Sequence, residues 1–361
     1  MPPSLSDLRA FAVTRSLFRP ATLKTAIEKL GFVQADPIRA PARAQDLILR
    51  QRVRDYRSGD LERRYAGLGV EEDVFVNYGF VSKAVHALMH PRQKLLLPAA
   101  PRSRAHKLVA FVRDRGEAHP RDVDAHFSHG TVTNYWGGSS NATTHLLEHL
   151  HYRGWLRVVR RERGIRVYSF RDSVTAPGDL PVRGRVDALV DVAVNLYAPV
   201  PALSLSYLIA RLRYAVPQWR PLLKGALARA RARLAREQID GIDWYWPAGE
   251  EPRASDEPSN VRLLAPFDPV VWDRRRFELF WGWPYRFEAY TPLAKRKFGY
   301  YALPILWRDR VVGWANLQNA DGAFQAAFGY VDAKVPRDRS FRRELQAELD
   351  RFEGFLEISG T

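Results

Sequence analysis

The sequence predicts an α+β protein of about three tandem winged helix-turn-helix domains, followed by a small C-terminal β-sheet or barrel-like subdomain. Residues 105–170 are ordered as three helices and then a basic β-hairpin, which is the order of a winged helix. Residues 186–247 repeat this theme without close sequence identity, and segments after residue 287 are rich in the aromatic and β-branched residues of strands. We therefore predict four domains, at residues 1–98, 99–178, 179–250 and 251–361.

The first half of the chain contains the elements of two of these domains. Residues 5–31 read as two short helices that end at Gly31, and residues 32–38 alternate apolar and polar residues as a short strand or extended loop stopped by Pro37. Residues 39–57 have a basic, helical pattern. Beyond a boundary near Pro98, we predict helices at 105–115, from 119 and at 141–152, and paired strands at 155–160 and 165–170.

The second half contains the third domain and the C-terminal subdomain. Helices are predicted at 186–195 and 204–213, with a long arginine-rich helix at 221–238 and a turn and strand at 239–247. The polar, proline-containing residues 250–260 indicate a linker or long loop. Strands are then predicted at 287–290, 299–306 and 310–317, and an amphipathic helix at about 340–356.

Length and composition restrict the class of protein. The 361 residues, 46% of them hydrophobic, suffice for two or three domains with ordinary cores. The absence of cysteine excludes disulfides, thiol nucleophiles and cysteine-ligated metals. The start of the chain lacks the apolar region of a signal peptide, and no run of about 18 apolar residues follows. We therefore expect no membrane partner and a cytoplasmic, nucleoid-associated protein.

The positive charge of +16 is concentrated in one part of the chain. Residues 1–254 carry 40 basic and 25 acidic side chains, a net charge of +15, whereas residues 255–361 carry 16 and 15. Of the 56 cations, 47 are arginine, which suits bidentate phosphate contacts. A GC-rich genome also raises the ratio of arginine to lysine, but it does not explain the regional excess. Binding to an extended anionic partner, such as nucleic acid, does explain why the positive charge is concentrated in one region.

Two short patterns suggest cofactor sites. His145, Glu148 and His149 have the H-x-x-E-H spacing of some zinc peptidases. These residues lie on the helix before the basic hairpin, and we favour polar or phosphate-facing histidines because no third ligand stands out. The glycine pair within residues 134–140 matches neither common nucleotide-binding pattern, so a tight turn accounts for it. We expect neither a metal nor another cofactor.

Gln34, Ala35 and Asp36 form the candidate catalytic motif. In an extended segment, residues i and i+2 project to the same side, so the amide of Gln34 and the carboxylate of Asp36 can face one pocket. A carboxylate beside an amide suits cleavage of a base–sugar bond, because the carboxylate stabilises oxocarbenium-like charge or activates a water that the amide positions. Polar residues before a proline are also common turn formers, so the motif alone is a weak signal.

The surrounding residues give the motif its context. The segment 31–49 resembles the N-terminal signature of the YcaQ-like DNA glycosylases, relatives of the azinomycin-resistance glycosylase. Further similar blocks are 136–154, the strand end 166–168, and a long C-terminal stretch from Leu264 to Arg276 and from Tyr290 to Gly313.

The resemblance implies tandem winged helices around a DNA-binding concavity. It also implies hydrolysis of the N-glycosidic bond of bulky N7-alkylated purines, including one side of an interstrand crosslink. The family's glutamine–apolar–acid motif falls on residues 34–36, so the resemblance implies that Gln34 and Asp36 are catalytic. Where some members have a stretch with histidine and glutamate, this chain reads Phe75 to Phe80, which leaves crosslink activity less certain than activity on monoadducts.

The chemistry of such a substrate fits a simple site. N7 alkylation gives the base a positive charge and makes it a good leaving group, so a carboxylate and a positioned water suffice. Since no lysine lies near the motif in sequence, we expect a monofunctional enzyme. We also expect it to be a monomer and to act on double-stranded DNA with alkylated bases. The alternative is a non-catalytic winged-helix regulator that prefers one DNA sequence. Candidate DNA-backbone contacts are Arg39, Arg43, Arg50, Arg157, Arg160 and Arg161.

Overall fold

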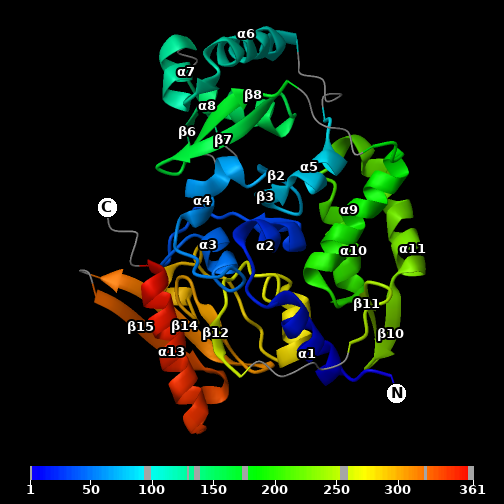
Figure 1. Ribbon diagram of the computed structural model, residues 1–361, viewed down its shortest axis with the longest axis vertical. Coiled ribbons are helices and arrows are strands. Elements are labelled where there is room, and N and C mark those ends of the chain that lie inside the picture. The colour runs from blue at the N-terminus through cyan, green and yellow to red at the C-terminus, as the bar shows by residue number, and fades with distance from the viewer. Residues whose placement is uncertain are drawn as a thin grey trace.

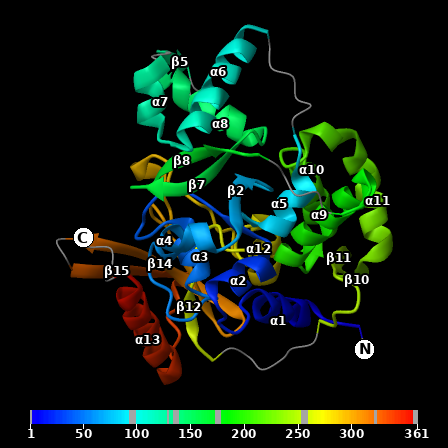
Figure 2. The same cartoon turned by 45° about the horizontal axis from the view of Figure 1, so that its top comes forward.

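The protein has a mixed α/β structure of helices and small antiparallel sheets, as the sequence predicts. The computed structural model describes residues 2–92, 99–127, 130–133, 139–172, 178–252, 259–320 and 323–356. In Figure 1 a first unit lies in the centre, a second above it, a third to its right and a C-terminal sheet below it to the left. Figure 2 shows the same neighbours after rotation.

The first unit surrounds the candidate catalytic motif. A reciprocal capping box between Ser4 and Asp7 begins its first helix, and Gly31, with φ of 70°, ends its second. The strand that carries Gln34 follows directly. The elements are α1 (Leu5–Ser16), α2 (Leu23–Leu30), β1 (Phe32–Gln34), α3 (Ala44–Leu49), α4 (Asp60–Arg64), η1 (Tyr65–Gly67), β2 (Val70–Val74), β3 (Tyr78–Ser82) and α5 (Lys83–Met89).

The second and third units share the order helix, short strand, helix, helix and hairpin, with β5 and β6 inserted in the second and η2 in the third. The second unit consists of α6 (Ala99–Arg115), β4 (Glu117–Ala118), α7 (Pro120–Phe127), β5 (Thr131–Thr133), β6 (Ser139–Asn141), α8 (Ala142–Tyr152), β7 (Leu156–Glu162) and β8 (Ile165–Phe170). The third consists of α9 (Val182–Tyr197), β9 (Val200–Pro201), α10 (Ala202–Arg211), η2 (Pro217–Leu222), α11 (Leu223–Arg233), β10 (Ala235–Ile239) and β11 (Ile242–Trp246). The residues 134–138 of the glycine-pair segment lie outside the described residues.

Each of the three units has a three-stranded sheet with the same topology. The last strand of each hairpin is central, which gives the orders β1-β3-β2, β4-β8-β7 and β9-β11-β10. In each sheet the central strand also pairs with a short edge strand, β1, β4 or β9, which lies between two helices earlier in the same unit. The three units are therefore built on one repeated plan.

The C-terminal unit is an open four-stranded sheet with the order β12-β13-β14-β15. The described strands form an antiparallel meander rather than a closed barrel, and α13 packs against β12. Its elements are β12 (Val261–Leu263), α12 (Arg274–Trp281), η3 (Leu293–Lys295), β13 (Leu303–Trp307), β14 (Arg310–Ala320), β15 (Ala323–Tyr330), η4 (Val331–Ala333) and α13 (Arg339–Leu356).

Three predicted elements differ from the structure. The basic segment 39–57 contains one six-residue helix, α3, between turns. The helix predicted at 221–238 ends at Arg233, because residues 235–239 pair with β11. The predicted strand at 287–290 has no strand pairing and leads into a turn.

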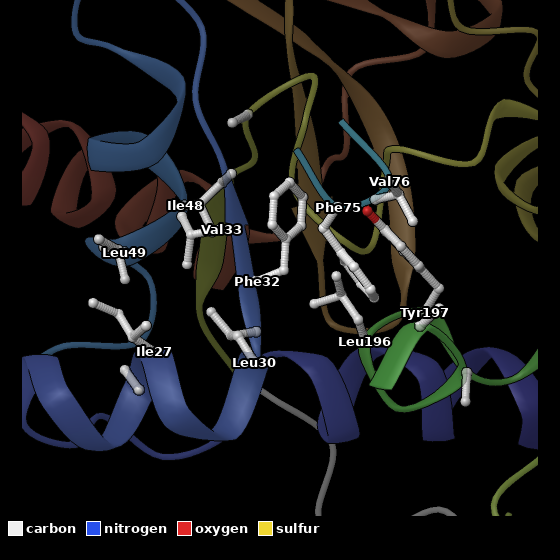
Figure 3. Packing of buried hydrophobic residues seen from close by; sticks show 14 of the residues in the cluster. Ile27, Leu30, Phe32, Val33, Ile48, Leu49, Phe75, Val76, Leu196 and Tyr197 are labelled. Atoms are coloured by element: carbon white, nitrogen blue, oxygen red, sulfur yellow. The ribbon is translucent and has the colours of Figure 1, made fainter. Parts of the chain in front are cut away.

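The apolar core beneath β1 fixes the position of the motif. Phe32 contacts Phe75 with ring centroids 5.6 Å apart, and Figure 3 shows Val33 beside Ile48. Gly79 of β3 faces Gln34, and a Cβ there would collide with the backbone of β1. The end of β1 is therefore held closely against the neighbouring strand.

A buried ion pair joins the first unit to the C-terminal unit. The guanidinium of Arg52 donates to both carboxylate oxygens of Asp268 at 2.7 and 3.0 Å, and both side chains are fully buried. Arg52 also donates to the carbonyl oxygens of Ser16 and Ile48 at 2.9 Å. The two units are thus connected by a fully bonded charge pair.

None of the described helices is long and apolar enough to cross a membrane.

Candidate active site

Gln34 and Asp36 lie at and just beyond the end of β1. Gln34 is the last residue of the strand and is 8% exposed. Asp36 follows in the irregular segment before Pro37 and is half-buried. The extended backbone predicted for 32–38 is thus a strand only up to Gln34.

The amide of Gln34 has a fixed orientation. Its Oε1 accepts hydrogen bonds from Nδ2 of Asn77 and from Nε1 of Trp272, both at 2.9 Å. An indole N–H can only donate, so the atom that faces Trp272 must be the amide oxygen. The Nε2 group is directed elsewhere, and no acceptor among the described residues takes a hydrogen bond from it. A donor is therefore available for a water or a substrate.

Residues of the third unit hold these two partners in place. Oδ1 of Asn77 accepts from Arg211 of α10, which also donates to the carbonyl of Val76 at 2.6 and 2.8 Å. The ring of Trp272 stacks on Tyr197 at the end of α9, with centroids 4.7 Å apart. The orientation of Gln34 consequently depends on contacts from the third and C-terminal units.

Few described groups compensate the negative charge of the Asp36 carboxylate. Its Oδ1 accepts from the backbone N–H of Ile38 at 2.9 Å, and among the described residues no basic side chain forms an ion pair with it. Burial raises the pKa of Asp36, and the hydrogen bond from Ile38 opposes this only in part. A carboxylate in this setting is a better proton acceptor than an ordinary exposed aspartate.

Two tyrosines of the C-terminal unit lie near Asp36. Burial, and then the nearby charge of Asp36, raise the pKa of both Tyr290 and Tyr301. The hydroxyl of Tyr301 is buried without a hydrogen-bond partner among the described residues, whereas Tyr290 is 79% exposed. The site thus combines a carboxylate, an amide donor and aromatic rings.

A hollow of about 440 Å³ lies next to the partners of Gln34, although neither Gln34 nor Asp36 lines it. Both hydrogen-bond partners of Gln34, Asn77 and Trp272, line it, together with Tyr207 and Arg211 from α10. Tyr207 is 52% exposed and its ring lies 6.1 Å from that of Trp272. The hollow can therefore admit a flat aromatic group next to the motif.

The six candidate DNA-contact arginines lie in different environments. Arg39 is exposed, and no described residue pairs with its side chain. It lines a hollow of about 340 Å³ with Arg43, which pairs with Glu62. The structure does not favour Arg50 as a DNA contact, because its side chain is 5% exposed and pairs with Glu348 at 2.8 Å. Arg39 remains an accessible candidate close to Asp36 in the chain, whereas the side chain of Arg43 is 11% exposed and held by Glu62.

The arginines of the β7–β8 hairpin serve mainly as internal ion-pair partners. Arg161 is 12% exposed and donates to both carboxylate oxygens of Glu72 at 2.8 and 2.7 Å. Arg157 pairs with Glu71 at 3.0 Å. Arg160 is exposed and pairs with Glu117 and Glu162 on its own unit. The hairpin therefore docks on β2, and Arg157 and Arg161 are not free as the sequence suggested.

The sequence contained a signal for this docking that our interpretation missed. Residues 71–73 of β2 are three consecutive acids, Glu71, Glu72 and Asp73, and all three are buried. Buried carboxylates need cationic partners. An acidic triplet inside an otherwise apolar strand thus indicates that nearby arginines are required within the fold. Part of the regional positive charge has this structural role.

Two of the three residues with the H-x-x-E-H spacing have arginine partners in the structure. Nε2 of His149 accepts from Arg153 at 2.7 Å, and Glu148 pairs with Arg166 at 2.9 Å. Elsewhere among the described residues, Asp73, His86 and His90 bring three ligand-type atoms together.

A buried arginine already supplies the cation for that second group. Arg92 donates to Oδ1 of Asp73 at 2.7 Å and is fully buried. His90 bonds the other oxygen of Asp73 at 2.6 Å, and burial lowers the pKa of both His86 and His90. A metal ion there would face a fixed guanidinium, so we assign the group as an ion-pair cluster.

Comparisons with known proteins give two matches. A family model described as "AlkZ-like: DNA glycosylase AlkZ-like" matches residues 27–355. The solved structure of the Streptomyces sahachiroi DNA glycosylase AlkZ is similar with a TM-score of 0.63 and 14% sequence identity. The similarity covers 98% of this chain and 97% of that one. At this identity the second match shows a shared fold.

Proposed function

The chain belongs to the AlkZ-like DNA glycosylase family, and on this premise we propose that it hydrolyses the N-glycosidic bond of bulky N7-alkylated purines in double-stranded DNA. The proposal also covers interstrand crosslinks, from which the enzyme releases one of the two linked bases. The observation that carries it is that the end of β1 places, two residues apart, an amide donor held in a fixed orientation, Gln34, and a carboxylate without a described ion-pair partner, Asp36.

The reaction assigns one task to each residue. The bond between the sugar C1′ and N9 breaks, and its electron pair leaves with the base, whose positive charge is thereby neutralised. Asp36 stabilises the positive charge that develops on the sugar and accepts a proton from the attacking water, whose oxygen bonds to C1′. Nε2 of Gln34 donates a hydrogen bond that positions this water. No protonation of the base is required.

The proposal includes a monofunctional mechanism, which the positions of the two lysines nearest to the motif in sequence support. A bifunctional glycosylase uses an amine as nucleophile. Lys24 lies beside Glu28 on the exposed face of α2, and the ammonium of Lys29 lies 4.1 Å from the ring of Phe18. Since neither lysine contacts Asp36, water is the proposed nucleophile.

The repeated topology supports three winged helices as the DNA-binding scaffold. In this proposal the three units flank the substrate, and the exposed Arg39 and Arg160 contact backbone phosphates. An open surface suits crosslinked bases, which cannot rotate freely into a deep pocket.

The proposed activity is tested by release of the free base. The purified protein is incubated with a duplex that contains N7-methylguanine, and the released base is quantified by chromatography. We expect release above the spontaneous rate and little dependence on flanking sequence. A protein that binds one duplex sequence tightly and releases no base would instead be a regulator.

Replacement of Trp272 by Phe tests the fixed orientation of Gln34. The change keeps the stacking on Tyr197 but removes the N–H that bonds Oε1. Loss of one such bond, about 1 kcal/mol, should lower kcat about three- to tenfold and leave KM nearly unchanged. Trp246→Phe removes a comparable bond, to the carbonyl of Glu250, and should leave kcat unchanged. Equal effects of the two variants would contradict the positioning role.

The pH dependence of the reaction should report Asp36. Because burial raises its pKa, and the ionised form is the active one, kcat/KM should fall on the acid side at a pH above the usual aspartate value of about 3.9. A pH–rate profile with the lesion duplex measures this limb. A profile that is flat down to pH 4 would show that the titrating carboxylate is not essential.

A further inference from the structure

A second hollow, remote in sequence from the motif, is rich in arginine. It has a volume of about 660 Å³ and lies between the segment 50–57 and α13. None of the residues that line the hollow beside Gln34 lines this one. The arginines that line it are Arg50, Arg54, Arg57, Arg262 and Arg351.

One buried carboxylate forms ion pairs with two of these five arginines. Glu348 is 2% exposed, and its two oxygens accept from Arg50 at 2.8 Å and from Arg351 at 3.0 Å. The backbone N–H of Leu263 and Nε2 of Gln51 also donate to Glu348, at 3.0 and 3.3 Å. This carboxylate is therefore saturated, and it holds Arg50 and Arg351 as structural partners.

The other three arginines have no carboxylate partner among the described residues. Arg262 donates to two neutral oxygens of Gln51, both at 3.2 Å, and its Nε is buried without a partner. Arg54 is exposed and Arg57 half-buried, and their side chains form no ion pair with a described residue. Asp55 is the other acid that lines the hollow, and it is exposed. An excess of positive charge thus faces one concave surface.

Burial makes this excess unfavourable for Arg262 in particular. Burial lowers the pKa of Arg262, which means that its charge is incompletely compensated in the fold. A guanidinium presents a planar set of donors that matches the oxygens of phosphate. An anionic phosphate group between Arg54, Arg57 and Arg262, which all line the hollow, would supply negative charge that the described carboxylates do not.

We propose that this hollow is a second, phosphate-binding site, separate from the Gln34 and Asp36 motif and independent of the glycosylase proposal. Its ligand is a phosphate group, carried either by the DNA backbone or by a free phosphate compound. Both sources offer anionic phosphate oxygens as acceptors for guanidinium donors, although a backbone phosphodiester carries a single negative charge.

The test compares two double variants of the full chain. Arg54→Ala with Arg57→Ala removes two cations without an ion-pair partner from the hollow. Arg339→Ala with Arg342→Ala removes two exposed arginines from the start of α13, outside the residues that line the hollow. Isothermal titration with sodium phosphate, at ionic strength matched with sodium chloride, measures the site directly. We expect wild type and the control to bind with similar Kd, and the first variant at least about tenfold more weakly.

Binding to a short unmodified duplex, measured across a salt series, distinguishes the sources. If DNA supplies the phosphate, the Arg54 and Arg57 variant should lose about 0.9 in salt slope for each contact removed, relative to the control. If phosphate binding is lost while the slope is unchanged, the ligand is a free phosphate compound. Absence of phosphate binding in wild type, or equal affinity in all three proteins, would overturn the proposal.

Discussion

Asp36→Asn should abolish nearly all base release while the protein remains folded. The amide cannot accept a proton from water and carries no charge to stabilise the sugar cation, so the single-turnover rate should fall by about 10²- to 10⁴-fold. The hydrogen bond from Ile38 can be retained by the amide oxygen. Duplex binding should be nearly unchanged, because no described basic residue pairs with Asp36.

The stability of the same variant gives a second readout. A carboxylate whose pKa is raised on folding favours the native state at low pH, and this contribution is lost as the pH rises through the raised value. At neutral pH the ionised Asp36 is therefore a cost to stability, and Asp36→Asn should have an unfolding free energy equal to or above that of wild type. A less stable variant would indicate that Asp36 has a structural role instead.

Asp268→Asn should produce the largest loss of stability among the changes considered. The substitution keeps the shape of the side chain but leaves the buried guanidinium of Arg52 without its counter-charge. Removing one partner of a buried ion pair costs about 3–5 kcal/mol. Chemical denaturation, followed by fluorescence, measures the change in unfolding free energy.

An exposed pair provides the matched control. Asp338 lies 3.7 Å from Arg308 and both side chains are exposed, so Asp338→Asn should change the stability by less than about 1 kcal/mol. If Asp268→Asn had an effect as small as that of the control, the Arg52–Asp268 pair could not be what joins the first and C-terminal units.

Local patterns predicted much of the fold. The helices of the second unit begin with features visible in sequence, such as Pro120 at the start of α7, and the β7–β8 hairpin follows from alternation around a short turn. The helix expected at 221–238 was too long because Ala235 to Ile239 pair with β11. Helical propensity cannot reveal such a pairing, in which tertiary contacts override local preference.

The candidate site shows the same division between local and distant information. Gln34 and Asp36 were found because they are two residues apart and stand in a characteristic segment. Asn77 and Trp272 were not, because they bond Gln34 across 43 and 238 positions of the chain. Charge composition is ambiguous for a related reason: it names Arg161 as a candidate DNA contact, but it cannot reveal that the guanidinium of Arg161 pairs with Glu72 within the fold.

The central claim is that Asp36 is the catalytic carboxylate of a DNA glycosylase. The most direct measurement treats an N7-methylguanine duplex with wild type or Asp36→Asn, cleaves the abasic sites with alkali and counts the strand breaks. The account predicts breaks well above spontaneous depurination for wild type and almost none above it for the variant, at equal duplex binding. No excess from wild type, or equal breaks from both proteins, would contradict it.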